Sequence, residues 1–220
     1  MRTHDDSIAG GPEIPPLPAV RLLLASGSVR RRDLLTRLGA DFHVVPASID
    51  DGQLSPPSTA SAISWTMAMA YLKARSAAQE LAPGSSGFIV GADTACELDG
   101  RIIGKPTDEN QARQMLRSMV GQSQCVVTGV AVIDASQPRG PRLVVADVAR
   151  VTFGMIYEDA IDRYLVTGAW RGKAGGYNLT ERIGDGWPIT VEGDPDTVVG
   201  LPTRRLGGWL GHAQSWGAPE

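Results

Sequence analysis

Short apolar runs and helical repeats alternate along the first half of the chain. The apolar runs are residues 20–25 and 87–92, and turn residues follow each of them, as is typical of buried strands. Over 29–38 and over 59–81, apolar residues recur at steps of three and four, which is the spacing of one helix face. Strands that alternate with helices in this way indicate an α/β fold.

The second half of the chain predicts more strand. Asp99-Gly100 is a two-residue turn pair between short apolar runs and predicts a hairpin. The remaining expected elements are a helix around 112–119, two long strands at 124–134 and 142–153, a helix around 161–165, a glycine-rich loop at 170–188, and a pair of short strands near 189–200.

The long helix predicted at 59–81 carries a stripe of small and apolar residues that we expect to be core. Its members are Ile63, Met67, Ala70, Ala74 and Ala77. Lys73 lies beside this stripe, so its ammonium either extends to solvent or reaches a cleft.

Chain length and composition suggest one structured domain with loose ends. The chain has 220 residues, of which 42% are hydrophobic, which suits one large domain or two lobes that share a core. Residues 1–18 mix charge, glycine and proline with few apolar residues, so we expect a flexible leader there. The expected division is a leader at 1–18, a domain at 19–212 and a C-terminal tail at 213–220.

Charge and apolar patterning exclude several classes of partner. Lys and Arg total 21 against 24 Asp and Glu, a net charge of −3, so a protein that coats nucleic acid polymers or binds membranes through a polybasic surface is not expected. Neither a run of ~20 apolar residues nor a signal-peptide pattern is present, and a cytoplasmic protein without a membrane span is the expectation.

Cysteine and histidine are too sparse for a sulfur or imidazole metal centre. Cys96 and Cys125 are the two cysteines, and we expect both to be reduced thiols. The histidines, His4, His43 and His212, lie far apart in the sequence. Any metal is therefore expected to have oxygen ligands.

A strand, the turn Ser26-Gly27-Ser28 and a helix follow one another near the start of the predicted domain. Small residues in such a turn let backbone N–H groups approach an anion at the helix N-terminus. Three arginines in succession from Arg30 crowd the first turn, where cations oppose the helix dipole unless an anion compensates them. The alternative is a capping turn with a solvated basic face, supported by an Asp33–Arg37 pair.

Carboxylates and lysines that could take part in catalysis or in phosphate binding occur elsewhere in the chain. Asp93 follows the apolar run 87–92, at the expected carboxyl end of a strand, where it could activate water or hold Mg²⁺. Lys105 lies in a stiff Gly-Lys-Pro turn and could neutralise a phosphate. Asp50 and Asp51 are loop acids or metal ligands. Singly, each residue has an ordinary structural explanation; together they suit a nucleoside triphosphate with its metal.

These motifs, in this order, resemble the Maf family of nucleoside triphosphate pyrophosphatases. The resemblance runs from about residue 21 to 206. It rests on five stretches: Leu22 to Leu35, Gly91 to Thr94 with Asp99 to Pro106, Thr128 to Ala131, Lys173 to Tyr177, and Val198 to Pro202. Val29 stands where the family has proline, a change that should soften the serine turn without removing a ligand.

The resemblance implies a fold and a reaction. The fold is a mixed sheet flanked by helices, with two lobes and a central nucleotide-binding cleft, in a family whose members often form homodimers. The reaction is hydrolysis of the α–β phosphoanhydride to a nucleoside monophosphate and pyrophosphate. Its cofactor is a divalent cation, Mg²⁺, Mn²⁺ or Co²⁺.

The resemblance also assigns roles residue by residue. Asp93 is the proton acceptor, and Asp50, Asp51 and Asp93 are the metal ligands. The phosphate-binding residues are Ser26, Arg30, Arg31, Lys73 and Lys105.

The substrate base follows from the residues after the Lys-Ala-Gly motif. The branch that prefers dTTP and UTP has glutamine there, whereas Glu181-Arg182-Ile183 resembles the branch that acts on 7-methyl-GTP. With Arg30 and Thr94, Glu181 is then a specificity residue, because a carboxylate accepts from the guanine N–H edge. A surface role for Glu181, a dTTP/UTP pyrophosphatase, and a nucleotide-binding regulator of septum formation are the alternatives.

Overall fold

The computed structural model describes residues 14–49 and 54–217 and contains a mixed α/β fold. Its strands are β1 (Leu22–Ala25), β2 (Phe42–Val44), β3 (Phe88–Leu98), β4 (Arg101–Ile103), β5 (Ser123–Asp134), β6 (Arg142–Phe153) and β7 (Ile189–Glu192). Its α-helices are α1 (Val29–Arg37), α2 (Ala62–Glu80), α3 (Glu109–Met119), α4 (Glu158–Val166), α5 (Leu179–Gly184), α6 (Pro195–Val199) and α7 (Thr203–Gln214). Two 3₁₀ turns complete it, η1 (Ala174–Gly176) and η2 (Ser215–Gly217).

The strands form one seven-stranded sheet in the order β2-β1-β3-β5-β6-β7, with β4 also paired to β3. β1 is parallel to both β2 and β3, and the other pairings are antiparallel. The predicted mixed sheet is therefore confirmed. The Asp99-Gly100 hairpin is also confirmed: both residues have positive φ, 50° and 72°, as a tight turn with this twist requires.

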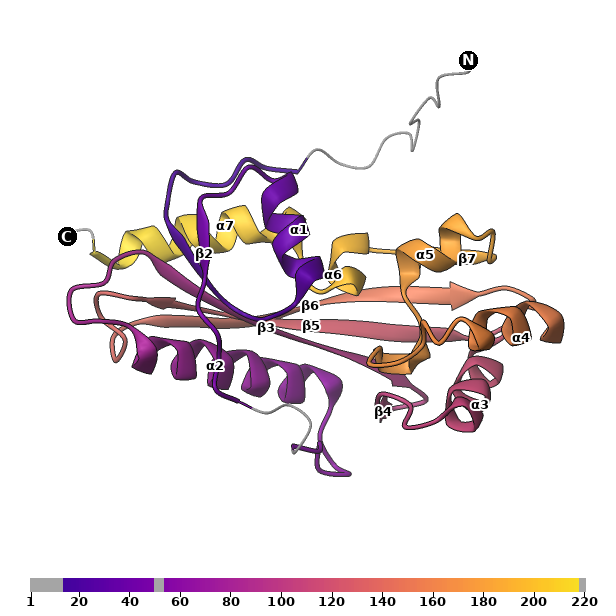
Figure 1. The fold of residues 1–220 in the computed structure, drawn as a ribbon. Helices are drawn as coiled ribbons and strands as arrows, with labels where there is room; N and C mark the ends of the chain where they lie inside the picture. Colours follow the sequence, from indigo (N-terminus) through magenta and orange to yellow (C-terminus); the bar gives the residue numbers. More distant parts are fainter. Residues whose placement is uncertain (1–13, 50–53, 218–220) are drawn as a thin grey trace, which may run out of the picture.

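Helices cover both faces of the sheet and one end of it (Figure 1). α2 lies along one face, and α1, α6 and α7 lie on the other. α3, α4 and α5 gather at the far end of the long strands, where they enclose a separate apolar cluster with buried side chains such as Leu116, Phe153 and Tyr164. The long strands β3 and β5 thus run through two lobes.

Two glycines allow α2 to pack very close to the sheet. A Cβ at Gly91 of β3 would lie 2.2 Å from the carbonyl oxygen of Ala70, and one at Gly129 of β5 would lie 2.3 Å from the carbonyl carbon of Thr66. Both contacts are with the α2 backbone, which cannot turn aside as a side chain can. Gly91 and Gly129, which belong to the sequence motifs, are therefore the positions against which α2 packs.

The buried face of α2 differs from the expected stripe. Ala70, Ala74 and Ala77 are buried as expected, but Ile63 is 47% exposed. Lys73 is on the buried face and only 6% exposed. The buried face of α2 is therefore rotated about the helix axis relative to the face predicted from apolar spacing. The reason is that the close approach of α2 to the sheet selects small residues rather than the most apolar ones.

The C-terminal third contains more helix than the sequence predicted. The expected loop at 170–188 contains α5, and the expected second short strand near 200 is the helix α6. α7 was not foreseen, although it buries Leu206, Leu210 and Ala213 against the sheet. Its three glycines weaken the helical signal in the sequence, and packing outweighs that low propensity.

Residues near both ends of the described chain pack against the domain. Leu17, expected in the leader, packs against the apolar cluster beneath α7, and the Pro16 carbonyl lies beside Gly207. Trp216, expected in the tail, makes an edge-to-face contact with Phe88 at 6.2 Å between ring centroids. The leader residues 1–13 lie outside the described residues. Within the described ranges, no helix is long and apolar enough to cross a membrane.

Gly129→Ala is expected to destabilise the fold by at least about 1–3 kcal/mol, because the new methyl group collides with the α2 backbone. Urea unfolding followed by circular dichroism measures the loss. Gly208→Ala is the matched control, since its Cβ would meet nothing within 4 Å. Gly208 is on the exposed side of α7, where alanine in place of glycine should stabilise the helix by about 0.5–1 kcal/mol. Equal stability of the Gly129→Ala variant and the wild type would contradict the close seating of α2.

Candidate active site

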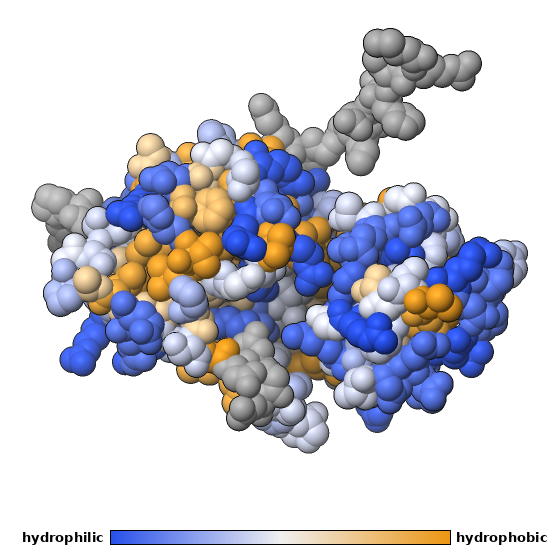
Figure 2. Space-filling view, in the orientation of Figure 1, coloured by the Kyte–Doolittle hydropathy of each residue, from blue (hydrophilic) through white to orange (hydrophobic). Residues whose placement is uncertain are grey.

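A cavity of about 850 Å³ lies between the two lobes. Figure 2 shows the surface hollowed between the part that carries α1 and the part that carries α3 to α5. Its walls come from distant segments of the chain: the turn before α1, the middle of α2, strand β3, the turn after β4, the segment around η1, and α6. The predicted cleft between two lobes is thus present.

The cavity opens at a gap in the strand pairing along one edge of β3. β1 pairs with this edge up to Gly91, and β4 pairs with it from Cys96 onward. Among the described residues, no strand pairs with the edge between them, which contains Asp93 and Thr94. The expectation that Asp93 follows the end of a strand is therefore wrong, since β3 continues to Leu98. It is β1, the parallel neighbour, that ends beside Gly91, two residues before Asp93.

Side chains alternate across β3, so the two motif residues at the gap face opposite sides of the sheet. Asp93 lies on the face of α2, where its Oδ1 accepts a hydrogen bond of 2.7 Å from Nζ of Lys73. Both side chains are largely buried, with 16% and 7% exposed. Of the two alternatives for Lys73, solvent or a cleft, the structure shows the second: its ammonium reaches this cavity and pairs with the carboxylate.

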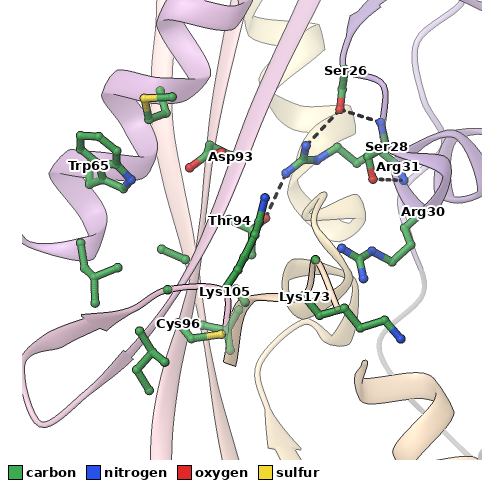
Figure 3. A pocket seen from close by; sticks show the side chains of 18 of the residues that line it. Ser26, Ser28, Arg30, Arg31, Trp65, Asp93, Thr94, Cys96, Lys105 and Lys173 are labelled. Carbon is green, nitrogen blue, oxygen red and sulfur yellow. Dashed lines mark hydrogen bonds between the residues drawn. The ribbon is translucent and has the colours of Figure 1, made fainter. Parts of the chain in front are cut away.

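The serine turn lies directly beyond β1, on the other side of the gap (Figure 3). Ser28 caps α1 and accepts a bond from the backbone N–H of Arg31, as the sequence predicts for an N-cap. Ser26 Oγ accepts from the backbone N–H of Ser28 at 3.2 Å and from Nη1 of Arg31 at 3.0 Å. A hydroxyl accepts two bonds and donates one, so Ser26 can direct its hydrogen into the cavity.

Arg31 connects the serine turn with β3 and α6. Its Nε donates to the Gly200 carbonyl at 2.7 Å, and its Nη2 donates to Thr94 Oγ1 at 3.2 Å. The side chain is 9% exposed and lines the cavity. The electrostatic conflict of a cation in the first turn of α1 is therefore offset, for Arg31, by acceptors from three other segments.

Three further cations lie around the cavity. Arg30 and Lys105 line it as expected and are exposed. Lys173 lines it as well, although it was assigned no role from the sequence. The Lys-Ala-Gly motif was the available signal for Lys173. Two glycines close to a lysine indicate a tightly turned loop, and such a loop fixes the direction of the lysine side chain. Gly175 and Gly176 both have positive φ, 67° and 75°.

Glu181 lies in α5, close to the cavity rim. Its Oε2 accepts from Nζ of Lys173 at 2.7 Å, and its Oε1 accepts from Asn178 Nδ2 at 2.9 Å. The described residues that line the cavity include Lys173 and Asn178 but not Glu181. In this structure Glu181 therefore holds a rim lysine.

The expected metal ligands are represented in the described part of the chain by Asp93 alone. Asp50 and Asp51 lie outside the described residues. Within 14–49 and 54–217, no three His, Cys, Asp or Glu side chains gather as a metal site. Mg²⁺ is usually held by one or two carboxylates together with substrate phosphates, and Asp93 fits that smaller requirement.

Apolar side chains and one thiol also line the cavity. Trp65, Met69 and Ile102 line this part of the wall. Cys96 lines it too, but burial raises the pKa of its thiol to about 12. At neutral pH the thiol is therefore protonated, which argues against Cys96 as a nucleophile.

Curated relatives resemble the chain over most of its length. A dTTP/UTP pyrophosphatase of Moorella thermoacetica is 40% identical over 182 residues, which cover 83% of this chain and 89% of the relative. A dTTP/UTP pyrophosphatase of Pelotomaculum thermopropionicum is 38% identical over 189 residues, which cover 86% of this chain and 94% of the relative.

Among solved structures, a HAM1 protein from Coxiella burnetii is similar at 13% identity with a TM-score of 0.42, over 74% of this chain and 89% of that chain. The family profile described as Maf-like protein matches residues 21–213, a span that contains every described residue assigned to the site above. On this match and on the identity of the curated relatives, the chain belongs to the Maf family.

Proposed function

We propose that this protein hydrolyses a nucleoside triphosphate to its monophosphate and pyrophosphate, with dTTP and UTP as substrates. The observation that carries the proposal is the pairing of Asp93 with Lys73 at the gap in the sheet, beside the turn that holds Ser26 and Arg31. One cavity thus contains a carboxylate that can take a proton and a group of donors suited to phosphate oxygens.

Asp93 is the proposed base for the attacking water. Hydrolysis of a phosphoanhydride needs an oriented water that loses its proton as it attacks the phosphorus. Lys73 fixes one carboxylate oxygen of Asp93 through its hydrogen bond. The base is therefore held in position before substrate enters.

The serine turn and the surrounding cations are the proposed phosphate site. Ser26 donates its hydroxyl hydrogen, and Arg31 is held beside it by bonds to neighbouring segments. Arg30 and Lys105, on exposed parts of the wall, neutralise the outer oxygens. This charge neutralisation stabilises the transition state and the departing pyrophosphate.

A divalent cation is part of the proposal. Asp93 would hold it together with phosphate oxygens of the substrate, and the family resemblance assigns a further acidic ligand to Asp50 or Asp51. When bound, such a cation neutralises phosphate charge and acts as a Lewis acid.

The proposed nucleobase of the substrate differs from the first expectation. The pattern around Glu181 favoured 7-methyl-GTP, whereas the relatives named above are dTTP/UTP pyrophosphatases, which supports the alternative. In the structure Glu181 accepts from Lys173 and Asn178 and is not among the described residues that line the cavity. We therefore assign Glu181 to the orientation of Lys173.

A panel of nucleoside triphosphates assayed for pyrophosphate release tests the substrate. With Mg²⁺, Mn²⁺ or Co²⁺, dTTP and UTP are expected to give kcat/KM values at least about tenfold above those of dCTP, GTP and 7-methyl-GTP, a difference of about 1.4 kcal/mol in transition-state binding. Preference for 7-methyl-GTP would restore the first expectation. Tight binding without turnover of any nucleotide would favour the regulator instead.

Asp93→Asn is expected to lower kcat by about 10²–10⁴-fold, because the amide keeps the shape of the carboxylate but cannot take a proton. Circular dichroism should show an unchanged fold. Asp159→Asn is the matched control: this carboxylate is on the surface of α4, 67% exposed, and pairs only within its helix. Turnover of the Asp93 variant near that of the control would place the base elsewhere.

Glu181→Gln is expected to leave the ratio of kcat/KM for dTTP to that for 7-methyl-GTP unchanged within about threefold, since the carboxylate binds Lys173 and not the base. Both values should fall together if Lys173 loses its orientation. A change in the ratio of tenfold or more would assign base recognition to Glu181.

A further inference from the structure

A row of polar side chains crosses the centre of the sheet beside the cavity. Thr94 of β3 is directly opposite Thr128 of β5, which is directly opposite Asp147 of β6. Directly opposed residues share one face of a sheet. Here that face is the one covered by α6, and Thr128 in the middle of the row is completely buried. A buried hydroxyl needs a reason, because its desolvation is costly unless it is hydrogen-bonded.

The hydrogen bonds of this row have one direction. Thr128 Oγ1 donates to the Thr197 carbonyl at 2.6 Å, lies 2.8 Å from Thr94 Oγ1, and Thr94 Oγ1 accepts from Nη2 of Arg31 at 3.2 Å. A carbonyl can only accept and a guanidinium can only donate. Each hydroxyl has one hydrogen, so Thr128 donates to the carbonyl and Thr94 donates to Thr128.

This direction fixes what Thr94 offers to its surroundings. Its hydrogen points away from the cavity toward Thr128, and it presents a lone pair to the guanidinium of Arg31. Thr94 was expected to be a specificity residue. In this chain of bonds its hydroxyl is an acceptor for Nη2 of Arg31.

Thr128 also holds a second acceptor of Arg31 through α6. Thr197, in α6, is fixed to the sheet by the bond to its carbonyl and by its own hydroxyl, which donates to Asp147 at 2.5 Å. Three residues later, the Gly200 carbonyl accepts from Nε of Arg31 at 2.7 Å. Two of the bonds that orient the guanidinium therefore depend on the Thr128 hydroxyl, one through Thr94 and one through α6.

We propose that Thr128 is a positioning residue that sets the guanidinium of Arg31 for the phosphate groups of the substrate. The inference rests on the proposed function, because it gives Arg31 a phosphate to orient toward. It adds a residue that does not line the cavity and acts only through others. Burial strengthens the effect, since hydrogen bonds in a low-dielectric interior fix orientation more firmly than bonds exposed to water.

Three variants test the role of the hydroxyl. Thr128→Val keeps the shape of the side chain and removes the hydroxyl, and we expect kcat/KM for dTTP to fall by about tenfold to a hundredfold, as for a small misplacement of a substrate-positioning group. Thr128→Ser keeps the hydroxyl and should stay within about threefold of the wild type. Thr66→Val is the matched control, because Thr66 is equally buried but its hydroxyl donates only within α2.

A double-mutant cycle with Arg31→Lys separates positioning from a general loss of structure. If Thr128 acts through Arg31, adding Thr128→Val to Arg31→Lys should lower kcat/KM by less than about twofold. Effects that multiply would overturn the proposal. So would a folded Thr128→Val variant within threefold of the wild type, or equal losses in Thr128→Val and Thr66→Val. If Thr128→Val does not fold, Thr94→Val breaks the next bond of the chain, and the same cycle decides.

The outcome stays separate from that of the proposed function. A wild-type protein that releases no pyrophosphate from any nucleoside triphosphate overturns the proposed function alone. The role of Thr128 is then judged from calorimetric dissociation constants of a dTTP analogue with an α,β-methylene link. Weaker binding by about tenfold in Thr128→Val, but not in Thr66→Val, supports the proposal, and equal binding overturns it.

Discussion

The close contact between α2 and the sheet is the constraint on which the rest of the site depends. Gly91 and Gly129 have no side chains that would hold the helix away from the sheet. On the helix, the small residues Ala70 and Ala74 are buried on the face that packs against the sheet. At this distance the Lys73 side chain, one turn from Ala70, reaches Asp93. A larger residue at either glycine would lift α2 and separate the lysine from the carboxylate. The charge pair in the cavity is thus a consequence of backbone packing.

A second feature, the interruption of strand pairing along β3, decides where chemistry can occur. β1 ends beside Gly91 and β4 begins beside Cys96, so the edge between them faces the cavity rather than another strand. Side chains on both faces of the sheet become accessible at this one place. Asp93 contributes a carboxylate from the α2 face, and Thr94 contributes a hydroxyl from the opposite face. β1 ends at this place, and the serine turn is the next segment of the chain.

The polar row formed by Thr94, Thr128 and Asp147 connects this gap to the C-terminal helices. It passes beneath α6, which supplies a carbonyl to Arg31, and it ends at Asp147, whose other oxygen pairs with Arg205 of α7 at 2.8 Å. Through its hydrogen bonds, the row connects buried groups in the sheet to the guanidinium of Arg31 in the cavity and orients it. It also explains why threonine, which is common in strands but polar, occupies a completely buried position in β5.

The sequence by itself determined the class of fold. It also predicted seven residues that line the candidate cavity: Ser26, Arg30, Arg31, Lys73, Asp93, Thr94 and Lys105. The Asp99-Gly100 turn, the Ser28 cap and the apolar strands are encoded locally, by backbone preference and by periodicity, and so they could be predicted. What depends on distant contacts could not. Lys73 was placed beside the core stripe because spacing cannot reveal a helix seated on glycines, and α7 was missed because its stability comes from packing. The tertiary structure alone decided that Lys73 pairs with Asp93 and that Thr94 turns its hydrogen away from the cavity. Those roles are set by partners 20 and 34 residues away, which no local pattern specifies.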